Sequence, residues 1–370
     1  MKSAKFTTRT SAGESLKLGS TGLLASVCLL PLCALVGNAR AAAGVHLLPT
    51  QMPEVFVYSQ PDRQFDAISA SDEDLASAGF PPRPDPAKAP AAYERWSRVV
   101  GAHNARIDTP ELTETEIQHG TPANLVKSHQ AGEAASMAAL SSTNWSGFIA
   151  EAPNGTFTAN ESVTVTEFVV PVAQQAFKTC SGGWDYMSVW TGFDGVNSPD
   201  VLQAGIDVNA YCKLGTTEAS YGAWYEWLPN NEVLINNFPV APGDLMTIVV
   251  YYTTTAPHGH AFIANFTKAV EVSIAFNPPA GTVFHGNSAE WIVEAPTVSG
   301  SQSNLTNYVG LLSSSNYAFT SSIGYVYPGA APAKVTSYDV TMTNSRGYAI
   351  SGCSLLSVIA TKCEDEGPAL

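Results

Sequence analysis

Two short segments in the second half of the chain combine amide or acidic side chains with apolar residues in β-strand alternation. In the segment VLQAGID, alternation places Gln203 and Asp207 on one face and the aliphatic residues on the other. In the segment SAEWIVE, Glu290 and Glu294 share a face in the same way. Polar faces of this kind are able to line a groove that binds an extended polymer.

Two further segments have the same pattern. SVWTGFD places Trp190 and Asp194 on one face, and YGAWYEWL places Trp224 and Glu226 on one face. The candidate groove is therefore lined by Gln203, Glu290, Glu226, Asp194 and Trp190. Polar residues on the outer face of a strand are more often simply solvated, so spacing alone does not establish a site.

Familiar catalytic signatures are missing from the sequence. It contains no G-x-S-x-G elbow, no H-E-x-x-H helix and no D-T/S-G pair of a two-aspartate protease. His258 and His260 are spaced to share a strand face, but no acidic or cysteine ligand lies near them, and a surface pair is expected. The sequence predicts neither a metal nor another cofactor.

The candidate residues lie in a region with β-strand patterns throughout. From Ser141 onward, short segments rich in β-branched and aromatic residues alternate with Gly, Pro and Asn clusters, as in 162–170, 245–252 and 271–276. No long amphipathic helix is expected after Thr143. Many short strands in a unit of this size predict an antiparallel sandwich or barrel.

The first 138 residues differ in character. Basic residues, the apolar run 23–36 and the small residues around Ala41 predict a signal peptide over residues 1–41, and hence a secreted protein. The apolar run is shorter than the roughly 20 residues that a membrane span needs. Residues 42–138 are predicted to be a pro-segment, with an amphipathic helix over 91–107 and an exposed, cleavable connector over 131–142. The remaining unit is 139–370.

Charge and cysteine content limit the partners. The net charge of −14 argues against a nucleic-acid or anionic-membrane partner, because both need a basic surface. Four cysteines remain after the signal peptide, and an even number in an exported chain favours disulfides. Three pairings are possible, of which proximity in sequence favours Cys180–Cys212 and Cys353–Cys363.

Five motifs, in order, resemble those of the eqolisin (glutamic) peptidases. They are Thr143-Asn144-Trp145-Ser146-Gly147, Trp190-Thr191-Gly192-Phe193-Asp194-Gly195, Leu202-Gln203-Ala204-Gly205, Trp224-Tyr225-Glu226-Trp227 and Ala289-Glu290-Trp291-Ile292-Val293-Glu294. The resemblance extends from about Thr143 to Leu312, more loosely to about Val358. It implies a pepstatin-insensitive acid endopeptidase, made as a secreted proenzyme, with a sandwich of two antiparallel sheets like that of concanavalin-type lectins.

The resemblance also implies roles for individual residues. Gln203 and Glu290 match the family's catalytic dyad, while Trp190, Asp194 and Glu226 match supporting positions. Glu290 would accept a proton from the attacking water and return it to the departing amine. Gln203 would hydrogen-bond the developing oxyanion. The expected partners are protein or peptide substrates and the chain's own pro-segment, and a monomer is expected.

Two other functions fit some of these residues. A jelly-roll glycoside hydrolase would use paired carboxylates, for which Glu226 and Glu290 are candidates. A lectin-like binding module is suggested by fold analogy alone. Gln203 distinguishes a peptidase from the glycoside hydrolase, since a glycosidase has no need of it. The predicted pro-segment argues against the lectin-like module, since a lectin needs no inhibitory segment.

Overall fold

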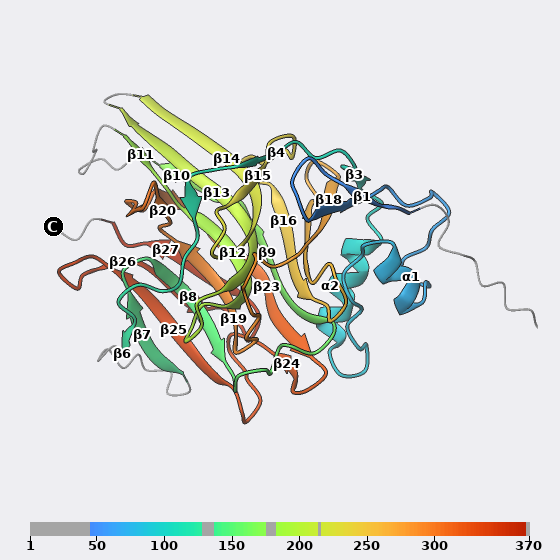
Figure 1. Ribbon diagram of the computed structural model, residues 1–370. Coiled ribbons are helices and arrows are strands. Elements are labelled where there is room, and N and C mark those ends of the chain that lie inside the picture. The colour runs from blue at the N-terminus through green and yellow to red at the C-terminus, as the bar shows by residue number, and fades with distance from the viewer. Residues whose placement is uncertain (1–44, 128–136, 175–182, 214–215, 368–370) are drawn as a thin grey trace, which may run out of the picture. The chain divides into compact units, whose positions relative to one another are not determined.

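The computed structural model describes residues 45–127, 137–174, 183–213 and 216–367 (Figure 1). Its only helices in these ranges are α1 (Asp72–Ser77) and α2 (Pro90–Val100), and all other elements are strands. Helix α2 overlaps the predicted helix 91–107 but begins one residue earlier and ends at Val100, where Gly101 caps it, and the chain then enters β3 (Ala105–Arg106). None of the described helices is long and apolar enough to cross a membrane.

One layer of the fold consists of six antiparallel strands. Their order across the sheet is β14 (Thr216–Trp227), β13 (Val201–Lys213), β12 (Ser188–Asp194), β19 (Ser288–Glu294), β8 (Trp145–Glu151) and β25 (Thr336–Thr343). Short strands extend it: β15 (Val233–Ile235) and β4 (Leu112–Glu114) beyond β14, β11 (Trp184–Asp185) beside β13, and β7 (Ala138–Ser142) parallel to β25. All four segments of the candidate groove lie in this first layer.

The second layer packs against the first. Its order is β23 (Leu311–Thr320), β9 (Ser162–Val169), β16 (Leu245–Tyr252), β17 (Gly259–Asn265), β18 (Val270–Phe276), β2 (Val55–Tyr58) and β1 (Leu47–Pro49). Strands β26 (Ala349–Leu355) and β27 (Thr361–Asp365) connect β25 to β23 and so join the two layers at one edge. A disulfide links Cys353 to Cys363 across this pair, which confirms that pairing. Cys180 lies outside the described residues.

A few short strands complete the described elements. Strand β24 (Gly324–Val326) pairs with β23, and β3 runs parallel to β18. Strand β10 (Val172–Gln174) pairs with β22 (Asn307–Val309). Strand β5 (Ile117–Gln118) pairs with β20 (Thr297–Val298), which pairs with β21 (Ser301–Gln302), and β6 (Val126–Lys127) pairs with β7.

The hydrophobic core lies between the two layers. Strands β12, β13 and β14 face β9, β16 and β17 across it. The first layer contributes residues such as Leu202 and Ile206, and the second contributes residues such as Ile248 and Ile263, all fully buried. Burying each such side chain stabilises the fold by roughly 1.5–3 kcal/mol. The predicted all-β sandwich of two antiparallel layers is confirmed.

Residues 45–127, called here the N-terminal segment, contact both layers. Helix α2 buries Trp96 and Val99 against Val163 and Val249 on the outer face of the second layer. Strands β1 and β2 extend that layer, and β4 extends the first. Helices α1 and α2 lie beside the strands of the second layer (Figure 1). A second cluster of buried apolar residues lies between these helices and that layer.

The structure corrects one expectation about the connector. Of the predicted exposed connector 131–142, residues 138–142 form β7, which pairs with β25 and buries Leu140 and Ser142. The small side chains there suit a strand packed closely between neighbours. Residues 131–136 and the predicted signal peptide 1–41 lie outside the described residues.

Candidate active site

Gln203 and Glu290 flank one glycine on the outer face of the first layer. Gly192 of β12 lies opposite Gln203 of β13 on one side and opposite Glu290 of β19 on the other. The two Cα atoms are thus two strands apart, roughly 10 Å. A Cβ at Gly192 would lie 2.9 Å from Gln203 Cβ and 2.6 Å from the Leu202 carbonyl oxygen. Because Gly192 has no side chain, residue 192 leaves the space between Gln203 and Glu290 on this face open.

The strand register extends this arrangement into three rows. The first row runs from Glu226 through Gln203 and Gly192 to Glu290. The second contains Trp224, Gly205, Trp190 and Ile292, and the third contains Gly222, Asp207, Ser188 and Glu294. An aromatic row therefore separates two polar rows.

A histidine of the N-terminal segment covers these rows. The His119 ring stacks on Trp224 with centroids 3.7 Å apart and planes 2° from parallel. His119 Nδ1 lies 2.9 Å from Glu226 Oε2, and Nε2 lies 2.7 Å from Ser188 Oγ. Gln203 Nε2 donates a hydrogen bond to the His119 carbonyl oxygen at 2.7 Å. His119, Gln203 and Glu290 are consequently fully buried.

Burial also governs the protonation of the carboxyl groups. It raises the pKa of Glu290 well above its usual value, and the charges of Asp194 and Asp200 add to this. The nearby Ser288 hydroxyl lowers the pKa in part. Neither carboxyl oxygen of Glu290 has a hydrogen-bond partner of good geometry among the described residues, and the Ser288 hydroxyl donates to Asn287 Oδ1 at 3.2 Å. Burial therefore favours the neutral form of Glu290 while His119 covers the site.

His119 itself is held as a cation. Burial lowers its pKa, but the nearby carboxylate of Asp207, the hydrogen bond with Glu226 and the charges of Glu226 and Glu294 outweigh burial and raise the pKa well above its usual value. A charged imidazole donates from both nitrogens, which matches its two short contacts. Burial likewise raises the pKa of Glu226, although the hydrogen bonds from His119 lower it in part.

Glu294 occupies the end of the third row. Its Oε2 accepts a hydrogen bond from Trp190 Nε1 at 2.8 Å, and its Oε1 accepts one from the Gly120 N–H at 3.1 Å. Burial raises its pKa to about 8, against a lowering by the His119 charge. The indole of Trp190 thus orients Glu294, and it packs edge-on against Trp145.

Asp194 is hydrogen-bonded to the loop that contains residues 285–287 and not to the side chains of the three rows. It accepts hydrogen bonds from the backbone N–H groups of His285, Gly286 and Asn287 at 2.8–3.0 Å. Burial and the neighbouring Asp200 raise its pKa to about 7 in spite of these donors. Because this loop leads directly into β19, Asp194 fixes the start of the strand that carries Glu290.

A model of the Peptidase A4 family matches residues 143–357, which include all five predicted site residues. The chain belongs to this family. Aspergillopepsin-2 from Aspergillus niger is 28% identical over 168 residues, which cover 41% of this chain and 56% of that protein. Scytalidopepsin B from Scytalidium lignicola is 31% identical over 108 residues, which cover 29% of this chain and 38% of that protein. The alignments thus span about half or less of these relatives.

Solved structures give further likenesses. A crystal structure of scytalido-glutamic peptidase with a peptide-based transition state analog is 20% identical, with a TM-score of 0.47, over 60% of this chain and 98% of that one. The aspergilloglutamic peptidase from Aspergillus niger is 22% identical, with a TM-score of 0.42, over 49% of this chain and 99% of that one.

In this Peptidase A4 member, several residues that border Gln203 and Glu290 were not among the site residues predicted from the sequence. Glu294 and Asp207 lie four residues after Glu290 and Gln203, so alternation had already put them on the right faces. Gly192 carried no chemical signal of its own. His119 was missed because it precedes residue 139 and was grouped with the predicted pro-segment. The expected groove is also not solvated, since His119 and its neighbours cover it.

Two clusters have the composition of metal sites. His119, Asp207 and Glu232 offer ligand atoms within 4.8 Å of one another, as do Asp194, Asp200 and His285. In each cluster the histidine has a close protein partner: His119 Nε2 lies 2.7 Å from Ser188 Oγ, and His285 Nδ1 lies 2.5 Å from Asp200 Oδ1. Each histidine is thus engaged by a protein partner, while both oxygens of Glu232 and Oδ2 of Asp200 have no hydrogen-bond partner among the described residues.

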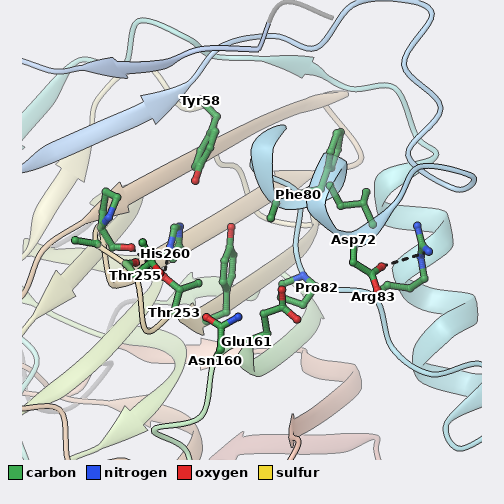
Figure 2. A pocket seen from close by; sticks show the side chains of 15 residues that line it. Tyr58, Asp72, Phe80, Pro82, Arg83, Asn160, Glu161, Thr253, Thr255 and His260 are labelled. Carbon is green, nitrogen blue, oxygen red and sulfur yellow. Dashed lines mark hydrogen bonds and ion pairs between the residues drawn. The ribbon is translucent and has the colours of Figure 1, made fainter. Parts of the chain in front are cut away.

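A separate cavity of about 300 Å³ lies between α1 and the outer face of the second layer (Figure 2). His260 lines it, stacked on Tyr251 with centroids 4.3 Å apart, and an Asp72–Arg83 ion pair of 3.3 Å lies across from it. Burial lowers the pKa of His260 to about 3. The prediction of a surface histidine pair is therefore wrong for His260, because the N-terminal segment covers this face.

Proposed function

We propose that this chain is a secreted acid endopeptidase in which Glu290 is the general base and Gln203 stabilises the oxyanion. The observation that carries the proposal is the arrangement around Gly192, with a peptide carbonyl already hydrogen-bonded to Gln203 Nε2 at 2.7 Å. An amide donor aimed at a peptide carbonyl is what oxyanion stabilisation requires. Trp190 and Asp194 position the site, and Glu226 binds the group that occupies it.

The reaction needs Glu290 to be a carboxylate. Displacing the N-terminal segment would let water reach Glu290, which reduces the effect of burial and lowers its pKa. The carboxylate would then take a proton from a water that attacks the scissile carbonyl carbon, and would return it to the departing amine. Gln203 does not titrate, so its hydrogen bond to the oxyanion persists in acid.

The same geometry disfavours a glycosidase. Glu226 and Glu290 lie three strands apart in their row, roughly 14 Å between Cα atoms, with Gln203 and Gly192 between them. The carboxyl groups that cleave a glycosidic bond are usually about 5–9.5 Å apart, so these two side chains would have to reach toward each other across Gln203, whereas Glu226 instead contacts His119 Nδ1 at 2.9 Å. No contact among the described residues favours this alternative or a lectin-like module.

An acid activity assay tests the proposed function. The full-length chain, incubated at pH 4, is expected to digest casein and to leave a β-glucan and a xylan intact. The Glu290→Gln chain, matched in size and fold, should digest none of the three. Cleavage of a polysaccharide, or casein digestion that survives Glu290→Gln, would contradict the proposal. Pepstatin should not inhibit the wild-type chain.

We also propose that residues 42–138 act as a pro-segment held in part by ion pairs. Arg95 Nη1 lies 3.0 Å from Glu167 Oε1, and Arg98 pairs with the other oxygen of Glu167. Arg106 pairs with Glu271 at 2.8 Å. Acid protonates carboxylates and so weakens such pairs, whereas the apolar contacts of Trp96 and Val99 do not depend on pH.

Glu167→Gln should speed release of the N-terminal segment about tenfold at pH 7, because it removes two partly exposed ion pairs together. All chains carry Glu290→Gln, and a site for an unrelated protease replaces residues 128–136. After that protease has cut the chain, dissociation of the N-terminal segment from the rest of the protein is measured over time. The exposed Glu218→Gln is the matched control. The proposal predicts that the parent chain releases the segment faster at pH 3.5 than at pH 7. If Glu167→Gln and the control release it at the same rate, and the parent is equally slow at both pH values, apolar contacts alone hold the segment.

A further inference from the structure

Residues 115–120 lie across the candidate active site as an extended peptide. The Thr115 N–H donates to the Glu232 carbonyl, and the Glu232 N–H donates to the Ile117 carbonyl, both at 3.0 Å. On the opposite edge, strand β5 pairs with β20, and the Ser299 N–H donates to the Glu116 carbonyl. Main-chain pairing on both edges is how a groove binds an extended peptide of varied sequence.

The bond between His119 and Gly120 is held at both ends. Its carbonyl oxygen accepts from Gln203 Nε2 at 2.7 Å, and the Gly120 N–H donates to Glu294 Oε1 at 3.1 Å. Gln203 is the proposed oxyanion donor, so this carbonyl occupies the position of a scissile one. The neighbouring peptide groups of this stretch lack that contact: the Ile117 carbonyl accepts from Glu232 and the His119 N–H donates to Glu226.

The side chain before this bond fills a specific pocket. The His119 ring stacks on Trp224, its Nδ1 is hydrogen-bonded to Glu226, and its Nε2 is hydrogen-bonded to Ser188. Asp207 and Glu232 lie 3.7 and 3.8 Å from Nε2. These contacts fix the position of residue 119 along the groove, and therefore the register of the bond that follows it.

The contacts change character immediately after Gly120. Asn144 Oδ1 accepts from the Ala123 N–H, and Asn144 Nδ2 donates to the Thr121 carbonyl at 3.2 Å. The Thr143 N–H donates to the Ala123 carbonyl, and β6 pairs with β7. Residues 121–127 are thus built into the first layer beside β8, whereas residues 115–119 only lie over it.

We propose that the chain hydrolyses its own His119–Gly120 bond, an inference that rests on the proposed peptidase function. The step begins when acid loosens the N-terminal segment enough to admit a water and to let Glu290 ionise, while the His119 carbonyl keeps its hydrogen bond to Gln203. Water then adds its oxygen to the His119 carbonyl carbon, and the Glu290 carboxylate takes the proton that water gives up. The C–N bond then breaks, Glu290 passes that proton to the Gly120 nitrogen, and the products are a His119 carboxyl group and a Gly120 amino group. The cut leaves residues 120–127 attached to the first layer and separates them from the chain before them, which β2, β4 and α2 still hold until those contacts are lost.

The test follows the ends of the chain. The full-length protein is incubated at pH 4 over a hundredfold range of concentration, and its products are identified by intact mass and N-terminal sequencing. We expect a fragment that begins at Gly120, formed at a rate independent of concentration, and none from Glu290→Gln. His119→Ala should slow this cut at least tenfold, whereas the exposed His46→Ala should not change it.

A peptide assay guards against misfolding of the His119→Ala chain. The acid-activated wild-type protein is given the synthetic peptide TETEIQHGTPAN, which copies residues 113–124. Cutting is expected between histidine and glycine, and at least tenfold slower when alanine replaces the histidine. If the protein digests casein but neither its own His119–Gly120 bond nor this peptide is cut, the inference is wrong and the proposed function stands. If casein is also untouched, the proposed function itself fails.

Discussion

Gln203→Ala is expected to lower kcat for a peptide substrate by about 10²–10³, the typical effect of losing one preorganised oxyanion donor. Gln203 Nε2 already donates to a peptide carbonyl at 2.7 Å, and its Oε1 has no partner among the described residues. That oxygen is therefore free to orient the attacking water. Because alanine keeps the strand and removes only the amide, the Michaelis constant should change much less than kcat.

The measurement requires chains whose activation does not depend on their own activity. Each variant carries the same site for an unrelated protease in place of residues 128–136, and is cut before kinetics at pH 4. Gln174→Ala, which removes an exposed glutamine from β10, is the matched control and should match the parent. Unchanged circular dichroism confirms the fold. A Gln203→Ala chain that keeps more than about a tenth of the parent kcat would rule out the assigned role.

The second large effect is on stability: the protein should be more stable at pH 4 than at pH 8. Burial raises the pKa of Glu294 to about 8 in the folded chain, from an ordinary value near 4.5. A group whose pKa is raised by folding contributes stability that is complete below its unfolded pKa and is lost as pH rises through its folded pKa. For Glu294 this loss is on the order of 5 kcal/mol between about pH 4.5 and 8.

Other groups in the site act in the same direction. The pKa values of Asp194, Glu226 and His119 are also raised on folding, so each of them loses its contribution as pH rises. The ion pairs of Arg95 and Arg98 with Glu167, which acid weakens, act in the opposite direction but are partly exposed. The midpoint of thermal unfolding should therefore fall from pH 4 to pH 8.

Glu294→Gln isolates the part due to one residue. Its amide oxygen is able to accept from only one of Trp190 Nε1 and Gly120 N–H, so the variant should be less stable than its parent in acid by about 1–3 kcal/mol. Its midpoint should nevertheless fall less between pH 5 and 8. Both chains carry Glu290→Gln to prevent self-digestion, and the exposed Glu114→Gln is the control. An equally steep fall in Glu294→Gln would show that Glu294 is not the group that titrates.

Local pattern was enough to predict much of this protein. Period-two alternation placed Gln203, Glu290, Trp190 and Glu226 on one face of a sheet, because the direction of a strand side chain depends only on its neighbours in sequence. The helix near residues 91–107 was predicted for the same reason, since one turn repeats every 3.6 residues. Its end at Val100 was missed, because Gly101 and the strand that follows it override the periodicity.

The tertiary structure alone decided how these faces meet. Strand β12 lies between β13 and β19, so Gly192 separates two residues that are 87 positions apart in the sequence. No local signal specifies such pairing, because it depends on the packing of the whole layer. The same holds for His119, whose fit against Trp224 and Glu226 spans more than a hundred residues. The sequence by itself determined which side chains face outward, and only long-range strand pairing decided that they surround one histidine and one peptide bond.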